Sequence, residues 1–575
     1  MRTCQWSYFL GGIFLIATNA CALLIPWLMK LAIESLQHRV TAIHTPQYYG
    51  GLIIAAALLQ GSIRIFSRTT LLHAARRIEF QIREDLYANL LKLDMPFFSR
   101  ERTGDILSRF ANDLTNVRML TGFGVLNIIN TVILYFSALF LLLKISTFLT
   151  CIAVIPVPLM IFTVKKISES MFHRSQRAQE ELARLSSHVE ENVSAAAMVK
   201  AYCLEEGQMR GFREISGRYL VSNMAMARLR GLMMPIMAAT GSAGTLAVLF
   251  IGGSKVISGA MTLGDFVAFN GYLAMLIWPT LVFGWILNLV QRGAASMQRI
   301  NYILDARSQI REPARPSAVE RISGTIELRD LSFAYQGNSE GNSVPVLSHI
   351  SLAIDKGMKV GIVGPVGSGK TTLLRLLARL YPVTDGMLLY DGIDINRIPL
   401  KILRNAIGFV PQESFLFSRS VEDNIAYGRA GAEKGEIESS ARLASLDGDV
   451  RRFPQAYLTL VGERGITLSG GQKQRTAIAR ALIKEPAVLI LDDPLSAVDA
   501  RTEEEILAGL ASYYGERTVL IASHRLSAVR DCDQIIVLDG GSIVEKGNHE
   551  GLLALDGKYA ATWREQQLRE EIENF

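Results

Sequence analysis

Cysteine and charge are both scarce in this chain of 575 residues. The five cysteines lie far apart and form no C-x-x-C pair, so we expect free thiols and neither a disulfide framework nor a zinc site. Charged residues make up 20% and apolar residues 49% of the chain. This balance excludes a disordered chain, a collagen-like chain and a disulfide-rich secreted module, and it argues against a wholly soluble protein.

Positive charge is concentrated in the apolar half of the chain. Residues 1–305 contain 28 Lys and Arg against 18 Asp and Glu, whereas residues 306–575 contain 32 against 36. A basic chain often binds nucleic acid, but here the basic half is also the half with long apolar runs. We therefore expect the bilayer surface, and no nucleic acid, as its partner.

Six apolar stretches are long enough to cross a membrane, which takes about 20 residues. The first is too long for the apolar part of a signal peptide and is followed by no A-x-A site, so we interpret it as a permanent span. The expected spans are 8–33, 49–66, 125–143, 145–164, 233–251 and 266–290.

The connections between the spans predict their orientation. Residues 68–118 carry nine Lys and Arg and residues 165–230 carry eleven, so the positive-inside rule places both segments and both chain ends in the cytosol. An inner (plasma) membrane location follows. Helical periodicity over 75–93 and 176–199 predicts that the spans continue into the cytosol, with reversals at 94–105 and at Gly207–Gly211. Amphipathic surface helices without a partner are the alternative.

The composition changes after about Asp305. The prolines of Arg311-Glu-Pro-Ala-Arg-Pro indicate a linker. Strand-like runs then follow at 325–335, 360–363, 488–491, 519–522 and 535–538, separated by helical stretches, which is typical of an α/β domain with a parallel core. The predicted domains are residues 1–305, a linker over 306–323, and residues 324–575.

A phosphate-binding motif lies between an expected strand and an expected helix. Gly364-Pro365-Val366-Gly367-Ser368-Gly369-Lys370-Thr371 matches G-x-x-x-x-G-K-[ST]. Its glycines let backbone N–H groups surround phosphate oxygens, and Lys370 supplies a cation to the β- and γ-phosphates. The Thr371 hydroxyl is a ligand for Mg²⁺. A second motif ends in an acidic residue: Asp492 follows Val488-Leu-Ile-Leu and is expected to hold the same Mg²⁺ ion. ATP and Mg²⁺ are therefore the expected cofactors.

Leu468-Ser469-Gly470-Gly471-Gln472 resembles the signature of ATP-binding cassette (ABC) proteins. With six preceding spans, nearly the whole chain resembles a half-transporter of the ABC exporter type. The resemblance implies a six-helix all-α transmembrane domain followed by an α/β P-loop nucleotide-binding domain. It also implies an ATPase that drives export of lipophilic or amphipathic compounds, as multidrug and lipid exporters do.

The resemblance implies roles for further positions. Tyr335 matches the aromatic residue that stacks on adenine, Gln412 the glutamine that senses Mg²⁺, and His524 the switch histidine at the γ-phosphate. Val461-Gly-Glu463-Arg-Gly matches a loop that contacts intracellular helices, and Ser496-Ala-Val-Asp499 a loop that crosses between cassettes. The implied ATP contacts are Tyr335, Gly364, Pro365, Val366, Gly367, Ser368, Gly369, Lys370, Thr371, Thr372, Ser469, Gly470, Gly471, Gln472 and Asp499; the implied Mg²⁺ ligands are Thr371, Gln412 and Asp492; and the implied catalytic residues are Asp493, His524 and Gln412.

Asp493 departs from the pattern of a hydrolytic cassette, which has Glu after its acidic strand. That Glu orients or deprotonates the attacking water. The Asp carboxylate ends about 1.5 Å short, and a misplacement near 1 Å costs roughly a hundredfold in rate. We therefore predict that the site built on Lys370 binds ATP but hydrolyses it poorly.

The intact signature predicts a partner. Cassettes of this type pair head to tail, so the pattern resembles heterodimeric ABC exporters with one degenerate and one consensus site. A second half-transporter is expected to supply the competent Glu. A homodimer with two slow sites, or a site where Asp suffices, is the alternative.

The cargo leaves fewer signs in the sequence. Asn19, Asn130, Asn270 and Asn288 lie within apolar runs, where they either join helices or touch cargo. Trp278, Phe283 and Trp285 are expected either to line a cavity for apolar or cationic molecules or to face lipid. A regulatory ATP sensor without cargo is the competing function, whereas the six apolar stretches exclude a soluble DNA-repair or translation ATPase.

Overall fold

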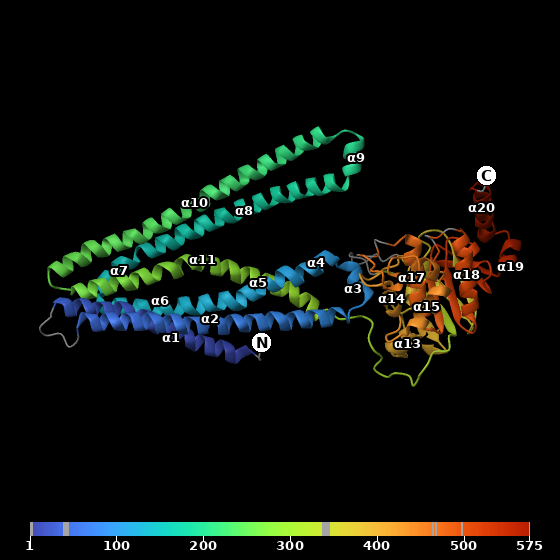
Figure 1. Ribbon diagram of the computed structural model, residues 1–575, viewed down its shortest axis with the longest axis horizontal. Coiled ribbons are helices and arrows are strands. Elements are labelled where there is room, and N and C mark those ends of the chain that lie inside the picture. The colour runs from blue at the N-terminus through green and yellow to red at the C-terminus, as the bar shows by residue number, and fades with distance from the viewer. Residues whose placement is uncertain are drawn as a thin grey trace. The chain divides into compact units, whose positions relative to one another are not determined.

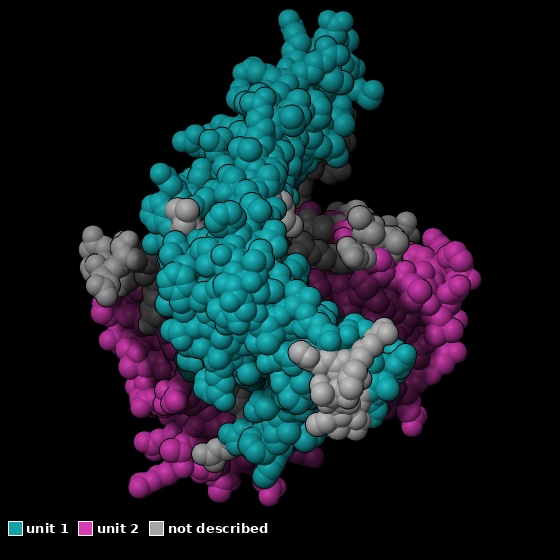
Figure 2. Space-filling view, turned by 90° about the vertical axis from the view of Figure 1, so that its left-hand side faces the viewer, with its two compact units in different colours: residues 1–91, 103–306 teal, residues 92–102, 307–575 magenta. Residues whose placement is uncertain are grey.

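The chain divides into two compact units, shown in teal and magenta in Figure 2. The structure is a computed structural model that describes residues 4–37, 45–335, 345–462, 465, 468–495, 498 and 500–573. Unit 1 comprises residues 1–91 and 103–306, and unit 2 comprises residues 92–102 and 307–575. A short stretch of the N-terminal half therefore packs with the C-terminal half.

Unit 1 is built from long helices (Figure 1). Two π-helical segments, Arg109–Asp113 and Leu120–Gly124, join α4, α5 and α6 into one helical run. The helices are α1 (Gln5–Gln37), α2 (Pro46–Leu90), α4 (Thr103–Ser108), α5 (Leu114–Met119), α6 (Val125–Ile145), α7 (Thr147–Val154), α8 (Pro156–Ser194), α9 (Ala196–Ala201), α10 (Glu205–Ile257) and α11 (Leu263–Asp305).

Four helical runs among the described residues are long and apolar enough to cross a membrane. They are Gln5–Gln37, Pro46–Leu90, Thr103–Ile145 and Leu263–Asp305, and they contain the expected first, second, third and sixth spans. The expected fourth span crosses the junction of α7 and α8, where Pro156 begins a new helix because proline has no N–H to continue the preceding one. The expected fifth span lies in α10, whose apolar section Ser242–Ile257 is shorter.

The reversal between α8 and α10 does not lie at Gly207–Gly211, and that prediction was wrong. The two helices run side by side in Figure 1, and both glycines lie inside α10. The chain turns instead around α9, with Cys203 in the left-handed region at φ +54°. A Cβ at Gly211 would lie 3.4 Å from the His188 ring, an ordinary van der Waals distance, so this glycine lies at the contact between α8 and α10 rather than in a turn.

The asparagines in the apolar runs behave in two ways. Asn19 Nδ2 donates to Asn130 Oδ1 at 3.0 Å, which joins α1 to α6. Asn270 and Asn288 each donate to a backbone carbonyl one turn earlier in their own helix. The first pair therefore acts between helices, as polar groups in apolar surroundings commonly do.

Few charged groups lie in the expected spans. Lys30 forms an ion pair with Asp265 at 2.7 Å, joining α1 to α11, and lies 3.9 Å from Glu34. Trp278 and Trp285 are exposed within unit 1. Their role as cavity or lipid-facing residues stays a prediction.

Unit 2 contains two sheets, and side chains of their strands form part of its two buried hydrophobic clusters. The six-stranded sheet has the order β10-β9-β3-β8-β7-β6, parallel except for β10. The four-stranded antiparallel sheet has the order β2-β1-β4-β5. The strands are β1 (Ile326–Phe333), β2 (Leu347–Ile354), β3 (Lys359–Val363), β4 (Leu388–Tyr390), β5 (Ile393–Asp394), β6 (Ile407–Val410), β7 (Val488–Asp492), β8 (Thr518–Ala522), β9 (Gln534–Asp539) and β10 (Ser542–Gly547).

Helices cover both faces of the parallel sheet. Neighbouring residues of one strand enter different buried clusters: Val519 packs in one, and Leu520 in the other. This explains why the interior positions of the parallel strands carry few polar side chains. The helices of unit 2 are α3 (Met95–Arg100), α12 (Lys370–Leu377), α13 (Leu400–Ala406), α14 (Val421–Ala426), α15 (Lys434–Leu443), α16 (Asp447–Val450), α17 (Gly470–Leu482), α18 (Ala500–Tyr514), α19 (His549–Ala554) and α20 (Lys558–Glu573).

Helix α3 belongs to unit 2 through specific contacts. The Ser99 hydroxyl lies 3.2 Å from the Tyr381 hydroxyl. The Asp94 carboxylate accepts hydrogen bonds from the backbone N–H groups of Gln309 and Ile310 at 2.5 and 3.2 Å. The segment that was expected to be a plain reversal is thus a short helix fixed to the C-terminal half.

The Asn19–Asn130 bond gives a first prediction. Replacing either residue with Leu should lower thermal stability in detergent. The destabilisation of the double variant should be smaller than the sum of the two single effects by a coupling energy of about 0.6 kcal/mol, the usual value for such bonds in a membrane. A double-mutant cycle of melting temperatures measures this coupling. Purely additive effects would show that these amides do not act together.

Candidate functional site

The loop between β3 and α12 is shaped for close backbone approach. Gly364, Gly367 and Gly369 have φ values of +151°, +83° and +102°, which side-chain-bearing residues rarely adopt. A Cβ at Gly364 would overlap the carbonyl oxygen of Leu538 in β9. The loop therefore lies against the parallel sheet, and its N–H groups and the N-terminus of α12 are available to anionic groups.

Lys370 is the first residue of α12 and is buried in this loop. Its Nζ donates to the carbonyl oxygens of Gly364 and Pro365 at 2.7 and 3.0 Å. Burial lowers the pKa of Lys370, while Asp493 and Asp492 oppose that shift. The charges of Lys370, Asp492 and Asp493 therefore interact with one another.

Asp492 ends β7 and faces the start of α12. Its Oδ1 accepts a hydrogen bond from the Thr371 hydroxyl at 3.0 Å. Burial raises the pKa of Asp492, and the bond from Thr371 opposes this. The bond brings together the two motifs that are 121 residues apart in the sequence.

Asp493 follows directly and is held by its backbone. It is buried, its φ is +51°, and its N–H donates to the carbonyl of Ala522 in β8 at 2.8 Å. A left-handed conformation at a residue other than glycine is uncommon and often marks a functional position. The direction of the Asp493 side chain is thus set by the sheet.

These side chains surround one cleft of about 340 Å³. Gly364 and Pro365 do not line the cleft, but their carbonyl oxygens accept hydrogen bonds from Lys370, which does. The residues Ser469, Gly470, Gly471 and Gln472 do not line the cleft either. Asp499 and Glu463 lie outside the described residues. The lining comprises Tyr335, Val346, Val366, Gly367, Ser368, Gly369, Lys370, Thr371, Thr372, Arg375, Gln412, Asp492, Asp493, Ala522 and His524.

The cleft fits a Mg-nucleotide. The buried Ser368 hydroxyl has no hydrogen-bond partner among the described residues, so the loop retains a donor for a phosphate oxygen. The Thr371 hydroxyl, the Asp492 carboxylate and the Gln412 amide are hard oxygen ligands of the kind that Mg²⁺ prefers.

Tyr335 is engaged from two sides. Its hydroxyl lies 2.9 Å from the Thr372 hydroxyl. Its ring packs edge-on against Phe333 and Tyr381, with centroids 5.1 and 5.2 Å away. The position at the rim of the cleft is compatible with adenine stacking, which stays a prediction.

The Ser469–Gln472 segment begins α17. Ser469 Oγ accepts from the Gln472 N–H at 3.3 Å, and Gln472 Oε1 accepts from the Ser469 N–H at 3.1 Å, a capping box. Gln472 Nε2 also reaches Asp449 at 3.4 Å. The exposed helix start is therefore rigid, and it is presented away from the lining of the chain's own cleft.

The loop that carries His524 is fixed by a residue that the sequence did not reveal. Gln566 of α20 donates to the His524 carbonyl at 2.6 Å and accepts from the Leu526 N–H at 2.9 Å. Glu503 of α18 holds the same loop through Arg525 at 2.6 Å. No motif marks Gln566, since its importance arises only when α20 packs against the loop that follows β8.

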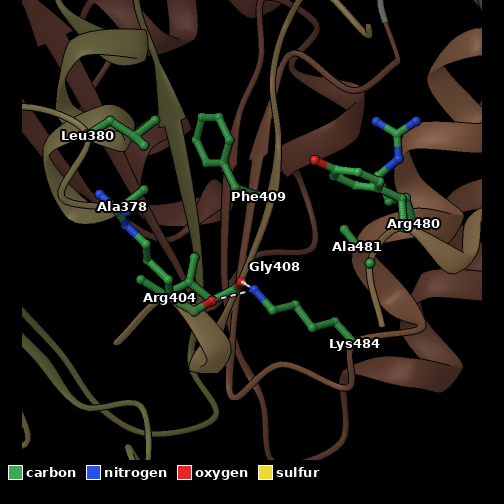
Figure 3. A pocket seen from close by; sticks show the side chains of 11 residues that line it. Ala378, Leu380, Arg404, Gly408, Phe409, Arg480, Ala481 and Lys484 are labelled. Carbon is green, nitrogen blue, oxygen red and sulfur yellow. Dashed lines mark hydrogen bonds between the residues drawn. The ribbon is translucent and has the colours of Figure 1, made fainter. Parts of the chain in front are cut away.

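A second cavity of unit 2, shown in Figure 3, has cationic walls whose N–H donors are already bonded to backbone carbonyls. Lys484 donates to the Ile407 carbonyl at 2.8 Å. Arg480 donates to the carbonyls of Asn424 and Phe415 at 2.8 and 2.9 Å. Burial lowers the pKa of both cations. These hydrogen bonds stabilise the packing around the cavity, so these donors are already engaged.

The loop glycines give a second prediction. Gly364→Ala should weaken ATP binding by at least a hundredfold, because its Cβ meets the Leu538 carbonyl. Gly367→Ala is the matched control: nothing lies within 4 Å of its Cβ, so only backbone strain of about 1 kcal/mol remains, or roughly fivefold in affinity. Titration with a fluorescent ATP analogue measures both, and equal losses would contradict the steric argument.

Gln566 gives a third prediction. Gln566→Ala should lower the slow ATP turnover of this chain purified alone about tenfold, while the dissociation constant for ATP changes less than twofold because the loop around Lys370 is untouched. The exposed neighbour Gln567→Ala should change neither quantity. Parallel losses of binding and turnover would indicate general unfolding rather than displacement of the His524 loop.

Known proteins share this arrangement over the whole chain. The description "ABC transporter transmembrane region" matches residues 8–280, and "ABC transporter" matches residues 347–496. A probable multidrug resistance ABC transporter ATP-binding/permease protein of Bacillus subtilis is 36% identical, with 98% of this chain and 95% of that protein covered. An ATP-dependent lipid A-core flippase of Syntrophus aciditrophicus is 35% identical, with 90% and 86% covered.

A solved structure agrees in fold. A bacterial Atm1-family ABC exporter with ATP bound superimposes with a TM-score of 0.79 and 28% identity, covering 97% of this chain and 99% of that one. Sequence, fold and the cleft between β3, β7 and α12 thus agree. The chain belongs to the ABC exporters and is a membrane-embedded, ATP-driven transporter with a transmembrane region followed by an ATP-binding domain.

Proposed function

We propose that the chain is one subunit of a dimeric exporter that moves lipophilic or amphipathic compounds, drugs or lipids, out of the cytosol or the inner leaflet. Helices long and apolar enough to cross a membrane support this, together with the drug- and lipid-transporting relatives. The membrane is the inner (plasma) membrane, with unit 2 in the cytosol, as the basic cytosolic segments predict.

The observation that carries the mechanism is the short carboxylate of Asp493. Its backbone is held by the bond to Ala522, so the side chain cannot move forward to replace the missing methylene. A water-orienting group displaced by about 1 Å costs roughly a hundredfold in rate. We therefore infer that the chain's own site binds ATP and hydrolyses it slowly.

The other residues of the cleft have separate tasks. Lys370 and the loop N–H groups bind the β- and γ-phosphates, and His524 contacts the γ-phosphate. Thr371, Asp492 and Gln412 would hold Mg²⁺, which neutralises charge on the phosphates when bound. None of these groups replaces the base that Asp493 is too short to supply.

The position of the Ser469–Gln472 segment supports a dimer. It is rigid, exposed and not part of the chain's own cleft, so it is available to the phosphate loop of another subunit. We infer a heterodimer in which a second half-transporter supplies a Glu after its acidic strand. A homodimer with two slow sites is the alternative.

Transport then follows from alternating access. Two ATP molecules bring the two ATP-binding domains together and turn the cavity outward, and hydrolysis at the partner's site resets it. Substrate accumulation in inverted vesicles that depends on Mg-ATP tests export directly. No accumulation of any lipophilic probe with any partner would argue for a regulatory role.

A fourth prediction concerns Asp493. In the complex with a co-purified second half-transporter, Asp493→Glu should change ATP turnover by less than about threefold, whereas Glu→Gln at the partner's equivalent position should nearly abolish it. Purified alone in nanodiscs, this chain should turn over far more slowly than the roughly 10 per second of a typical enzyme.

Asp493→Asn serves as the matched control because it keeps the length and removes the charge. It should leave turnover of the complex nearly unchanged. Brisk turnover by the chain alone, or equal sensitivity of the complex to changes at both sites, would overturn the asymmetric mechanism.

A further inference from the structure

A cavity of about 400 Å³ lies between α8 and α10, which run side by side in Figure 1. Its polar lining consists of His173, Arg174 and Arg177 with the hydroxyls of Ser170 and Ser222. Its apolar lining is Val221 and Ala225. The volume is within the range of small-molecule sites.

The cations of this cavity share one face of α8. Ser170, Arg174 and Arg177 are spaced four and three residues apart, so they form one ridge along the helix. Two arginines three residues apart repel each other by a few tenths of a kcal/mol. A cost of this kind is offset when an anion binds between them.

No carboxylate in the described part of the chain pairs with Arg174 or Arg177. The nearest acidic group on α8 that forms ion pairs is Glu181, and it is engaged by Arg184 at 2.8 Å and Arg218 at 3.3 Å. The cavity thus differs from the one in Figure 3, whose cations are bonded to carbonyl oxygens.

The place of the cavity along the helices is also informative. The apolar run of α8 ends near Val164 and that of α10 begins near Met233. At 1.5 Å per residue, the cavity lies about 10 to 20 Å beyond both apolar runs, next to the expected cytosolic membrane surface. Residues 165–177 contain four Lys and Arg but one Glu, and residues 221–230 contain two Arg and no acidic residue.

We propose that this cavity binds the anionic headgroup, a phosphate or carboxylate, of an amphiphilic molecule, and that the transported compounds include anionic amphiphiles. The two guanidinium groups form paired bonds to the anion, and both serine hydroxyls donate to its remaining oxygens. Val221 and Ala225 contact the first carbons of the chain. The link to transport rests on the proposed export function, whereas the binding site itself does not.

Binding without nucleotide tests the site independently of export. The full-length protein in detergent is titrated with fluorescent short-chain phosphatidic acid and with phosphatidylcholine of the same chains. We expect the anionic lipid to bind at least tenfold more tightly. Arg174→Gln with Arg177→Gln should remove that preference.

The control is Arg184→Gln with Arg213→Gln, which removes the same charge from the same helical hairpin outside the cavity. It should change affinity less than twofold. Arg174→Lys with Arg177→Lys keeps the charge and should give intermediate affinity. Melting temperatures confirm that each variant is folded.

Competition distinguishes the source of the anion. Inorganic phosphate or butyrate that displaces the lipid at low millimolar concentration supports a soluble organic anion, and no displacement supports a lipid headgroup. Equal affinity for the two lipids, or undiminished preference in the cavity variant, overturns the proposal. If binding behaves as expected but vesicles that accumulate other lipophilic probes accumulate no anionic amphiphile, the site stands and its link to transport is overturned; if no probe accumulates at all, the proposed export function fails.

Discussion

The hydrogen bond between Thr371 and Asp492 is the constraint on which the nucleotide site depends. It joins the start of α12 to the end of β7 across β8, which lies between β3 and β7 in the sheet. The strands therefore must be parallel and in register for both motifs to meet at one edge. Lys370 and Asp493 then lie at fixed places around the same point, and the charge of the cleft is set by the sheet rather than by loops.

The same cleft is connected through Tyr381 to α3, which comes from the N-terminal half of the sequence. Ser99 meets Tyr381, the Tyr381 ring packs on Tyr335, and Tyr335 meets Thr372 in α12. Each contact is a hydrogen bond or an edge-on aromatic pair within unit 2. These contacts form a continuous path of packed side chains from α3 to the start of α12.

The sequence was most informative where local rules decide the structure. The glycines around Lys370, the strand before Asp492 and the helix after Ser469 follow from turn chemistry, apolar pattern and capping. The role of Gln566 could not be predicted, because its contact with the His524 loop depends on the tertiary packing of α20, which no local sequence pattern encodes. The reversal after α8 was misplaced for the same reason: Gly211 lies at the contact between α8 and α10, and Cys203 adopts the left-handed turn that glycine was expected to provide.

In the proposed mechanism, a single methylene at position 493 separates ATP binding from ATP hydrolysis. Its N–H bond to Ala522 and its left-handed φ are properties of the backbone, so a Glu at this place would follow the same path and reach farther. The phosphate loop, Thr371 and Asp492 do not depend on that reach. In the proposed mechanism, ATP affinity and dimer closure are therefore retained while the chemical step is slowed, and such a subunit would need a partner that supplies the missing length.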